Sequence, residues 1–85
     1  MKLVICSVRD RAVSGFARPM FVQTVGVAVR SFGDEVNRKD PDNPLYKHPE
    51  DYDLFELGLF DETSGRFEVL DSPRQVAVGK DLVRS

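Results

Sequence analysis

The chain has 85 residues, of which 41% are hydrophobic and 31% are charged, and its formal net charge is −2. This length allows one small domain, which we place over residues 1–85, and the composition excludes global disorder. No apolar run approaches the ~18 residues that a membrane-spanning helix needs. The apolar run after Met1 ends at Arg9, too early for a signal peptide, so we expect a cytoplasmic protein.

The charges are unevenly distributed along the chain. Residues 1–39 carry seven basic and three acidic side chains, residues 40–72 carry two and ten, and residues 73–85 carry three and one. One interpretation is a basic face that binds phosphates, with an acidic face turned away from it. The other, simpler interpretation is that the acidic side chains only solvate a loop and a hairpin.

The first part of the chain predicts a strand followed by a loop. The continuous apolar run within Lys2–Val8 is typical of a central strand that is covered on both faces. Residues 9–19 are mostly charged or small and include glycine and proline, so they predict a long loop of the kind that often carries function. A second, short strand at residues 20–22 is an option that the pattern leaves open.

A helix is predicted from Thr24 onward, where the period of the apolar residues changes. Thr24 is suited to be its N-cap, and Asn37 with the basic pair after it suits its C-terminal end. Glycines at positions 26 and 33 each weaken a helix by about 1 kcal/mol relative to alanine, which indicates close packing against a sheet or a partner. The apolar face consists of Val25, Ala28, Val29, Phe32 and Val36.

A turn at residues 40–44 and a hairpin follow the helix. Strand Tyr52–Phe60 should place Phe55, Leu57 and Leu59 on one face and Leu54, Glu56, Gly58 and Phe60 on the other. Residues 61–65 form a tight connection in which Gly65 can take a positive φ, and Arg66–Leu70 returns as the second strand. Ser72 and Pro73 predict a short helical turn. The apolar residues within 76–83 either form a final short strand or pack onto the sheet.

The predicted fold is α+β, in the order strand, helix, hairpin and tail. One main helix packs on one face of a small antiparallel or mixed sheet, and the other face of a lone chain would expose Leu54 and Phe60. An exposed apolar sheet face is usually covered by a second copy. A core this small also gives a thin margin of stability, and the single cysteine, Cys6, allows no internal disulfide. We therefore expect a homo-oligomer, most simply a homodimer.

The sequence lacks a combination of residues typical of an enzyme. His48 is the only histidine and lies in a polar loop, whereas Cys6 lies within a strand and resembles a small buried apolar group. The carboxylates of Glu50, Asp51 and Asp53 are clustered, but their spacing does not match a calcium-binding loop. We predict a non-enzymatic protein with no catalytic residues, no metal and no cofactor.

Basic and aromatic side chains are interleaved in the segment before the helix. Binding of single-stranded DNA needs basic groups for the phosphates and aromatic rings for base stacking. The alternative is that the arginines only solvate a loop and that Phe16 joins the core, as we expect for Phe21; Tyr46 could equally pin its loop to the sheet. The candidate nucleic-acid-binding residues are Arg9, Arg11, Phe16, Arg18, Arg30, Arg38, Lys39 and Tyr46.

Three segments together resemble a known family. They are Met1–Val8, Gly26–Asn37 and the string KHPEDYDLFELGLFD at residues 47–61. These segments are similar to the small non-structural protein of gokushoviruses, which are single-stranded DNA phages of the microvirus group. The resemblance implies a phage protein in the cytoplasm of the host bacterium. It also implies DNA binding or an association with replication, as the family is commonly described.

Two hypotheses about function follow. The first is a phage non-structural protein that binds single-stranded DNA in genome replication or packaging as a homodimer. DNA binding is implied mainly by the resemblance, since the residues support it only through the basic first half and the negative net charge opposes it. The alternative is a protein-interaction adaptor or regulatory protein that contacts viral or host proteins and has no nucleic-acid activity.

Overall fold

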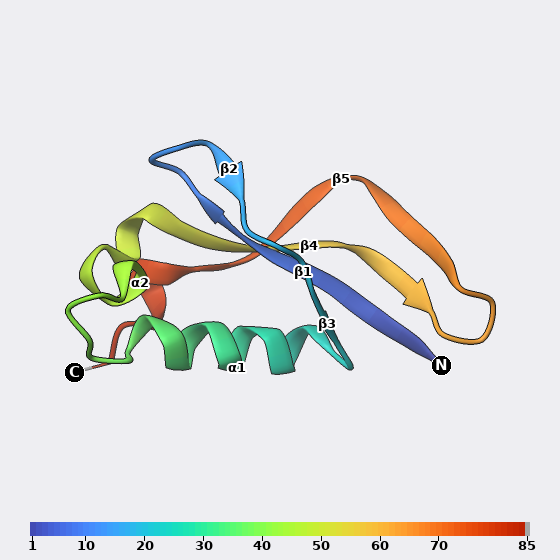
Figure 1. Ribbon diagram of the computed structural model, residues 1–85, viewed down its shortest axis with the longest axis horizontal. Helices are drawn as coiled ribbons and strands as arrows, with labels where there is room; N and C mark the ends of the chain where they lie inside the picture. The colour runs from blue at the N-terminus through green and yellow to red at the C-terminus, as the bar shows by residue number, and fades with distance from the viewer. Residues whose placement is uncertain (85) are drawn as a thin grey trace.

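The structure, a computed structural model that describes residues 1–84, contains a curled antiparallel sheet with one long helix on one of its faces (Figure 1). None of the helices within the described residues is long and apolar enough to cross a membrane. The elements are β1 (Lys2–Asp10), β2 (Gly15–Phe16), β3 (Met20–Val22), α1 (Val25–Val36), α2 (Pro44–Lys47), η1 (Pro49–Asp51), β4 (Tyr52–Asp61), β5 (Arg66–Val78) and η2 (Gly79–Leu82).

Strand β1 is the centre of the sheet. It pairs with β4 along one edge and with β2 and then β3 along the other, and β5 lies outside β4. Every pairing is antiparallel, so the sheet is antiparallel rather than mixed. The predicted α+β class, with one main helix on one face of a small sheet, agrees with this arrangement.

The order of elements differs from the prediction before the helix. Three strands precede α1 instead of one, because β1 continues to Asp10 and the chain folds back through a turn in which Ser14 has a φ of 54°. Arg9 and Phe16 are thereby cross-strand partners rather than residues of a long loop. The short strand at residues 20–22, which the sequence left open, is present as β3.

The helical turn predicted at Ser72–Pro73 is wrong. Both residues lie within β5, which extends from Arg66 to Val78 and is followed by the short 3-10 helix η2. Proline is tolerated here because β5 is an edge strand and departs from regular pairing at this point.

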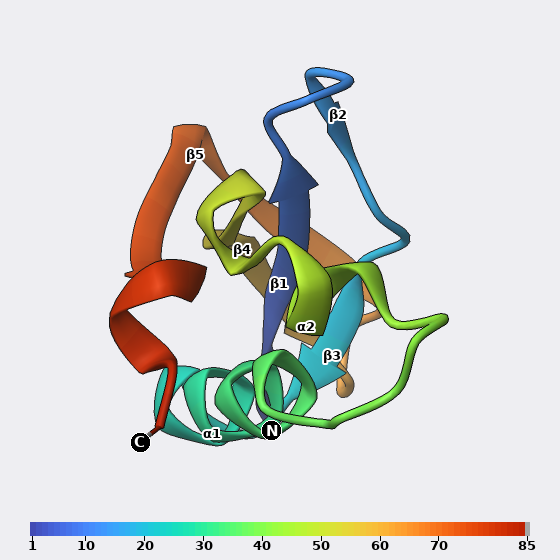
Figure 2. The same ribbon diagram turned by 90° about the vertical axis from the view of Figure 1, so that its left-hand side faces the viewer.

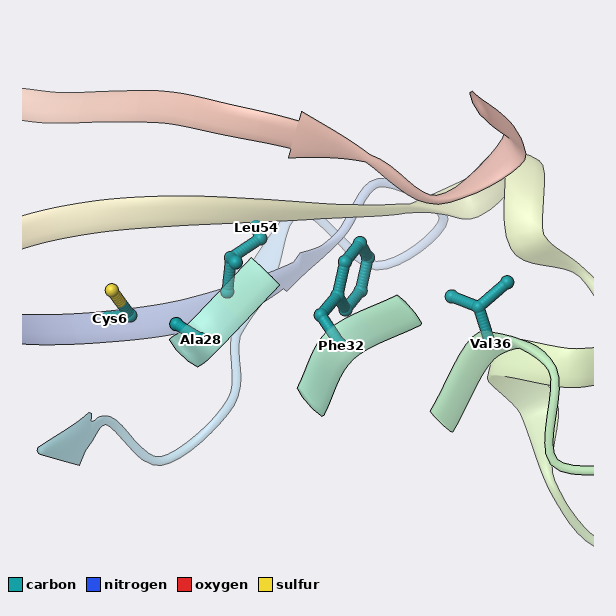
Figure 3. Packing of buried hydrophobic residues seen from close by; sticks show 5 residues of the cluster. All are labelled: Cys6, Ala28, Phe32, Val36 and Leu54. Atoms are coloured by element: carbon teal, nitrogen blue, oxygen red, sulfur yellow. The ribbon is translucent and has the colours of Figure 1, made fainter. Parts of the chain in front are cut away.

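Helix α1 has the predicted bounds and covers the hydrophobic core. The Thr24 hydroxyl oxygen accepts a hydrogen bond from the Val27 backbone N–H at 3.2 Å, which caps the first turn. Figure 3 shows the helix side chains pointing toward β1 and β4.

Burial raises the pKa of the Cys6 thiol, so this cysteine is an apolar core residue rather than a reactive one. The buried cluster consists of Cys6, Ala28, Phe32, Val36 and Leu54.

The buried side chain of Asn43 joins the end of α1 to the start of α2. Its amide nitrogen donates hydrogen bonds to the carbonyl oxygens of Glu35 at 2.8 Å and Arg38 at 3.0 Å. Its amide oxygen accepts a hydrogen bond from the Leu45 backbone N–H at 3.1 Å. One side chain therefore satisfies backbone groups at the ends of two helices and fixes the turn predicted at residues 40–44.

A bulge in β4 changes which side chains face the helix. Ile5 pairs with Gly58 and Cys6 pairs with Glu56, so Leu57 has no partner on β1. On one side of the bulge Leu54 faces the core, whereas on the other side Phe60 faces away from it. The predicted strict alternation, which placed Leu54 and Phe60 on the same face, is therefore wrong.

Strand β5 bends away from β4 opposite the bulge at Leu57. Glu56 pairs with Arg74 and Gly58 with Val69, so residues 70–73 of β5 lie opposite Leu57 alone. These residues form the arch of β5 in Figure 1. The arch divides β5 into a straight outer part, near the turn at residues 62–65, and an inner part that leads to η2.

Candidate nucleic-acid interface

The sheet face turned away from α1 carries most of the aromatic side chains. Figure 2 shows α1 lying along the opposite side of the sheet. Side chains of cross-strand partners point to the same side of the sheet, so each ring can be assigned from its partner on β1. The partners of these rings are alternate residues of β1, which all point away from α1. We call this side the open face and the five phenylalanines on it the aromatic row: Phe16, Phe21, Phe55, Phe60 and Phe67.

The aromatic row consists of two groups of rings in contact. Phe16 and Phe55 meet edge to face with their centroids 5.4 Å apart. Phe60 lies 5.7 Å from Phe21 and 5.0 Å from Phe67. Phe16 and Phe60 pair with Arg9 and Leu3 of β1, so the whole row spans about 20 Å at ~3.3 Å per residue. The nearest rings of the two groups, Phe55 and Phe21, pair with Ser7 and Ile5 and are therefore about 7 Å apart along the strand.

Three rings of the aromatic row are exposed, whereas Phe55 and Phe60 are half-buried. The side chains of Phe16 and Phe21 are each 46% exposed, and that of Phe67 is 59% exposed. The prediction that Phe21 belongs to the core is therefore wrong. Ile5 and Ser7 occupy the same face between the two groups and are buried, so the larger side chains form its surface.

Arg9 lies at one end of the aromatic row. Its guanidinium carbon is 5.9 Å from the centroid of the Phe16 ring, a distance at which cation–π attraction operates. Arg9 makes no ion pair with any carboxylate within residues 1–84, and its buried Nε has no hydrogen-bond partner there. Its cross-strand partner on β4 is Asp53, whose buried Oδ1 also has no hydrogen-bond partner among the described residues.

The two other arginines of this region differ from each other. The Nε of Arg11 lies 3.2 Å from Oδ2 of Asp53, and its guanidinium also donates to the carbonyl oxygen of Glu50. Because the Asp53 side chain is only 5% exposed, Arg11 compensates a nearly buried carboxylate. Arg18 is exposed between β2 and β3 and forms no ion pair with the described residues. Arg9 and Arg18 are thus the free cations near Phe16 in the described part of the chain.

The remaining candidate residues lie elsewhere. Arg30 is exposed on α1, which packs on the core side of the sheet, and Lys39 is exposed just beyond the same helix. Tyr46 is 37% exposed on α2, whose Leu45 packs against the core cluster that faces α1. The structure therefore does not gather the eight candidate residues on one surface. It brings together Arg9, Phe16 and Arg18, with Arg11 nearby.

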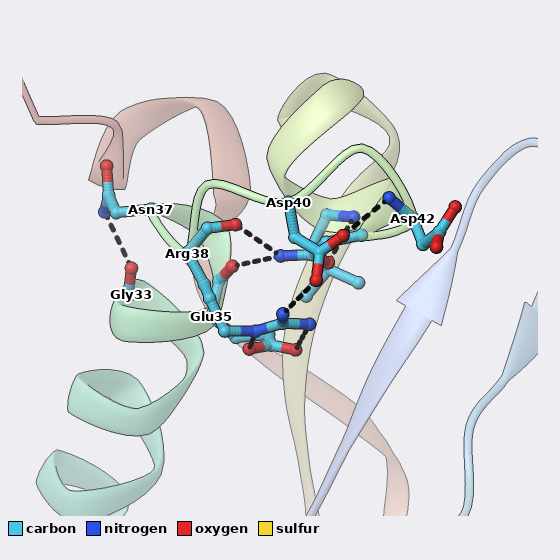
Figure 4. Close-up of polar contacts among 8 residues, drawn as sticks. Gly33, Glu35, Asn37, Arg38, Asp40 and Asp42 are labelled. Carbon is cyan, nitrogen blue, oxygen red and sulfur yellow. Dashed lines mark hydrogen bonds and ion pairs between the residues drawn. The ribbon is translucent and has the colours of Figure 1, made fainter.

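Arg38 is held in a cluster of carboxylates at the end of α1 (Figure 4). Its Nε lies 2.6 Å from Glu35 and its Nη1 lies 3.0 Å from Asp40. Hydrogen bonds from Arg38 lower the pKa of Glu35, and the Asp42 backbone N–H, followed by Arg38, lowers the pKa of Asp40. The charge of Arg38 is thus neutralised within the chain.

This cluster predicts a loss of stability in acid. Carboxyl groups whose pKa is lowered by folding stabilise the fold above their unfolded pKa, and this contribution disappears as the pH falls through the folded pKa. We expect the Tm to be level from neutral pH down to about pH 4.5 and to fall below it. The Arg38→Ala variant should lose less Tm over the acid range, as measured by circular dichroism. An equal acid loss in both proteins would contradict this role of the cluster.

An apolar pocket of about 400 Å³ adjoins the Phe16 end of the aromatic row. Burial raises the pKa of Tyr52, and the nearby carboxylate of Asp10 adds to the effect. Val8, Leu45 and Tyr52 place most of this pocket on the helix side of the sheet, and Phe16 contributes to its wall from the edge strand β2. The pocket is lined by Val8, Asp10, Val13, Gly15, Phe16, Ala17, Leu45 and Tyr52.

Four residues of the aromatic row, Phe21, Phe55, Phe60 and Phe67, are absent from the candidates predicted from the sequence. The turn contained a usable signal, since Asp61 and Arg66 close the hairpin and Phe60 must then pair with Phe67. The bulge at Leu57 also had a sequence signal in Gly58, because an isolated glycine inside a strand often marks a bulge. Without the bulge, the face on which Phe60 lies could not be assigned.

Comparison with known proteins identifies the family. Residues 3–82 match the family described as Phage ORF5 protein. Protein ORF5 of Chlamydia phage 1 is 42% identical over 45 residues, which cover 53% of this chain and 47% of that protein, so the match spans about half of this curated relative. No solved structure matches the chain. The chain therefore belongs to the Phage ORF5 protein family, which confirms its resemblance to the small proteins of gokushoviruses.

Proposed function

We propose that this phage protein binds single-stranded DNA on its open face, without catalytic activity, during genome replication or packaging in the cytoplasm of the host bacterium. The observation that carries the proposal is the aromatic row, which ends at the unpaired Arg9 on a sheet face that α1 does not cover. A sheet with exposed aromatic rings is a recurrent platform for unpaired bases.

The proposed mode of binding follows from the geometry of the row. Bases of any sequence stack on exposed rings because every base has a flat π-face, so we expect little sequence preference. The aromatic row, which spans about 20 Å along β1, provides several stacking positions for one strand. Arg9 and Arg18 bind phosphates near Phe16.

The net charge of −2 implies that stacking contributes more to the affinity than phosphate contacts do. Each phosphate neutralised on a single strand changes the slope of log affinity against log salt by about −0.7. Two contacts, from Arg9 and Arg18, therefore predict a slope of about −1.4. This slope is shallow for a protein that binds nucleic acid mainly through charge.

Replacement of Phe16 by alanine is expected to weaken binding of a fluorescein-labelled thymidine oligonucleotide by about 5- to 150-fold, because a base–aromatic stack contributes about 1–3 kcal/mol. Fluorescence anisotropy at ~50 mM salt measures the change. The matched control is Val27→Ala, since Val27 is 48% exposed, close to the 46% of Phe16, and lies on α1. Equal affinity of the two variants would remove Phe16 from the site.

Replacement of Arg9 by alanine is expected to reduce the salt slope by about 0.7 on every sequence alike. Arg30→Ala is the control, because Arg30 is an exposed arginine on α1, on the other side of the sheet. Titrations at several salt concentrations give both slopes. A slope changed by Arg30→Ala and not by Arg9→Ala would place the phosphates on the helix side instead.

The exposed rings also favour the alternative function, a protein-interaction adaptor, because accessible aromatic side chains are enriched where proteins bind one another. The oligonucleotide titration separates the two functions. Absence of binding at ~50 mM salt, with the chain folded, would reject the DNA proposal and favour the adaptor.

A further inference from the structure

The outer edge of β5 has no partner strand. Among the described strands β5 pairs only with β4, and its residues from Arg66 to Gln75 are all exposed. An exposed strand edge presents unpaired backbone N–H and C=O groups that can pair with another strand. Three large apolar side chains accompany this edge: Phe67 at 59%, Val69 at 74% and Leu70 at 39% exposure.

Only the outer part of β5 is suited to pairing. The arch at residues 70–73 interrupts the regular strand, and Pro73 has no backbone N–H to donate. The straight stretch between the hairpin turn and the arch is Arg66–Val69. A partner strand must therefore be short and must meet β5 near its outer end.

We propose that this stretch pairs antiparallel with the same stretch of a second copy of the chain, with the two-fold axis at Phe67. In an antiparallel pair, directly opposed residues have their side chains on the same side of the sheet. A two-fold axis between identical strands must therefore lie midway between the two copies of one residue. With the axis at Phe67, the two Phe67 rings face each other. Arg66 of each copy then faces Glu68 of the other, which gives two ion pairs of opposite charge.

Neighbouring registers lack this complementarity. An axis at Glu68 places two carboxylates opposite each other, and an axis at Arg66 does the same with two guanidinium groups, which is unfavourable in both cases. An axis at Val69 places Glu68 opposite Leu70 and forms no ion pair. Glu68 also contacts Lys2 of its own chain at 2.8 Å, and its second oxygen remains available to Arg66 of the other copy.

Pairing in this register joins the two open faces into one. Phe60 and Phe67 of one copy become continuous with the same residues of the second copy, so each copy adds rings to the surface of the other. The dimer does not depend on the proposed function. If the open face does bind DNA, a strand that contacts both copies gains affinity because its second contact is intramolecular.

A charge-swap experiment tests the dimer in the absence of DNA. Sedimentation velocity of the wild-type chain over a wide range of concentrations should show a concentration-dependent dimer. Arg66→Glu and Glu68→Arg should each be monomeric over the same range, since each brings like charges together. An equimolar mixture of the two variants should restore the dimer, because opposite charges then meet at both positions. A wild-type chain that stays monomeric, or single variants that dimerise as well as wild type, would overturn the proposal.

A cross-linking measurement covers the case in which a charge variant does not fold. Phe67→Cys places thiols on either side of the two-fold axis and should give a disulfide-linked dimer under mild oxidation. Val27→Cys, on α1, is the control and should remain unlinked, whereas Cys6 is buried in both variants. Equal cross-linking of the two variants would also overturn the proposal. Because neither assay contains DNA, failure of the DNA titration leaves these results unchanged.

Discussion

Replacement of Phe32 by alanine is expected to lower the free energy of unfolding by about 3–5 kcal/mol. Phe32 is 2% exposed and is the largest side chain of a core that contains only five buried residues in its main cluster. A chain of this length has about 4–13 kcal/mol of stability in total, so the substitution removes a large part of it.

Urea unfolding followed by circular dichroism measures this effect. Phe16→Ala is the matched control, because it removes the same atoms from a ring that is 46% exposed. We expect the control to lose no more than about 1 kcal/mol, since less apolar surface leaves the folded state. Equal losses in the two variants would contradict the assignment of the core to the helix side of the sheet.

Replacement of Gly58 by alanine is expected to destabilise the fold by about 1–3 kcal/mol or more. A Cβ at this position would collide with the carbonyl oxygen of Glu68 and would lie 2.8 Å from the Cα of Val69. Both atoms belong to the backbone of β5, which cannot move away without breaking its pairing with β4. The same displacement would separate Phe60 from Phe67 and alter the aromatic row.

Gly33→Ala is the control for this prediction and should have the opposite sign. A Cβ at Gly33 meets its nearest neighbour, Cδ1 of Leu82, at 3.7 Å, which is an ordinary contact. Within α1, alanine is preferred over glycine by about 1 kcal/mol, so this variant should be at least as stable as wild type. Urea unfolding of both variants gives the comparison. A stable Gly58→Ala variant would show that β4 and β5 approach less closely at the bulge.

The helix and the hairpin were predicted correctly because both are specified by short stretches of sequence. The helix was predicted at its observed bounds, because its apolar residues repeat with a helical period and Thr24 is a good N-cap. The hairpin was predicted for the same kind of reason, since Gly65 takes a φ of 72° in the turn between β4 and β5. The side of the sheet on which each aromatic ring lies was not predicted.

The errors have a common physical origin in long-range pairing. The bulge at Leu57 is a feature of the pairing of β4 with β1, and Gly58 beside it hints at its position without giving the register. In the same way, Ser72 and Pro73 favour a helical turn locally, but pairing on both sides of them keeps the chain extended. Phe21 resembles a core residue in its local sequence, and only its pairing with Ile5 places it on the open face.

Alternate side chains of strand β1 point to opposite faces of the sheet and contribute to different parts of the structure. Val4, Cys6 and Val8 support the helix, whereas Leu3 and Arg9 belong to the surface on the other side. Changes at one set leave the contacts of the other set largely intact. A substitution on the open face can therefore alter that surface while the architecture beneath it is retained.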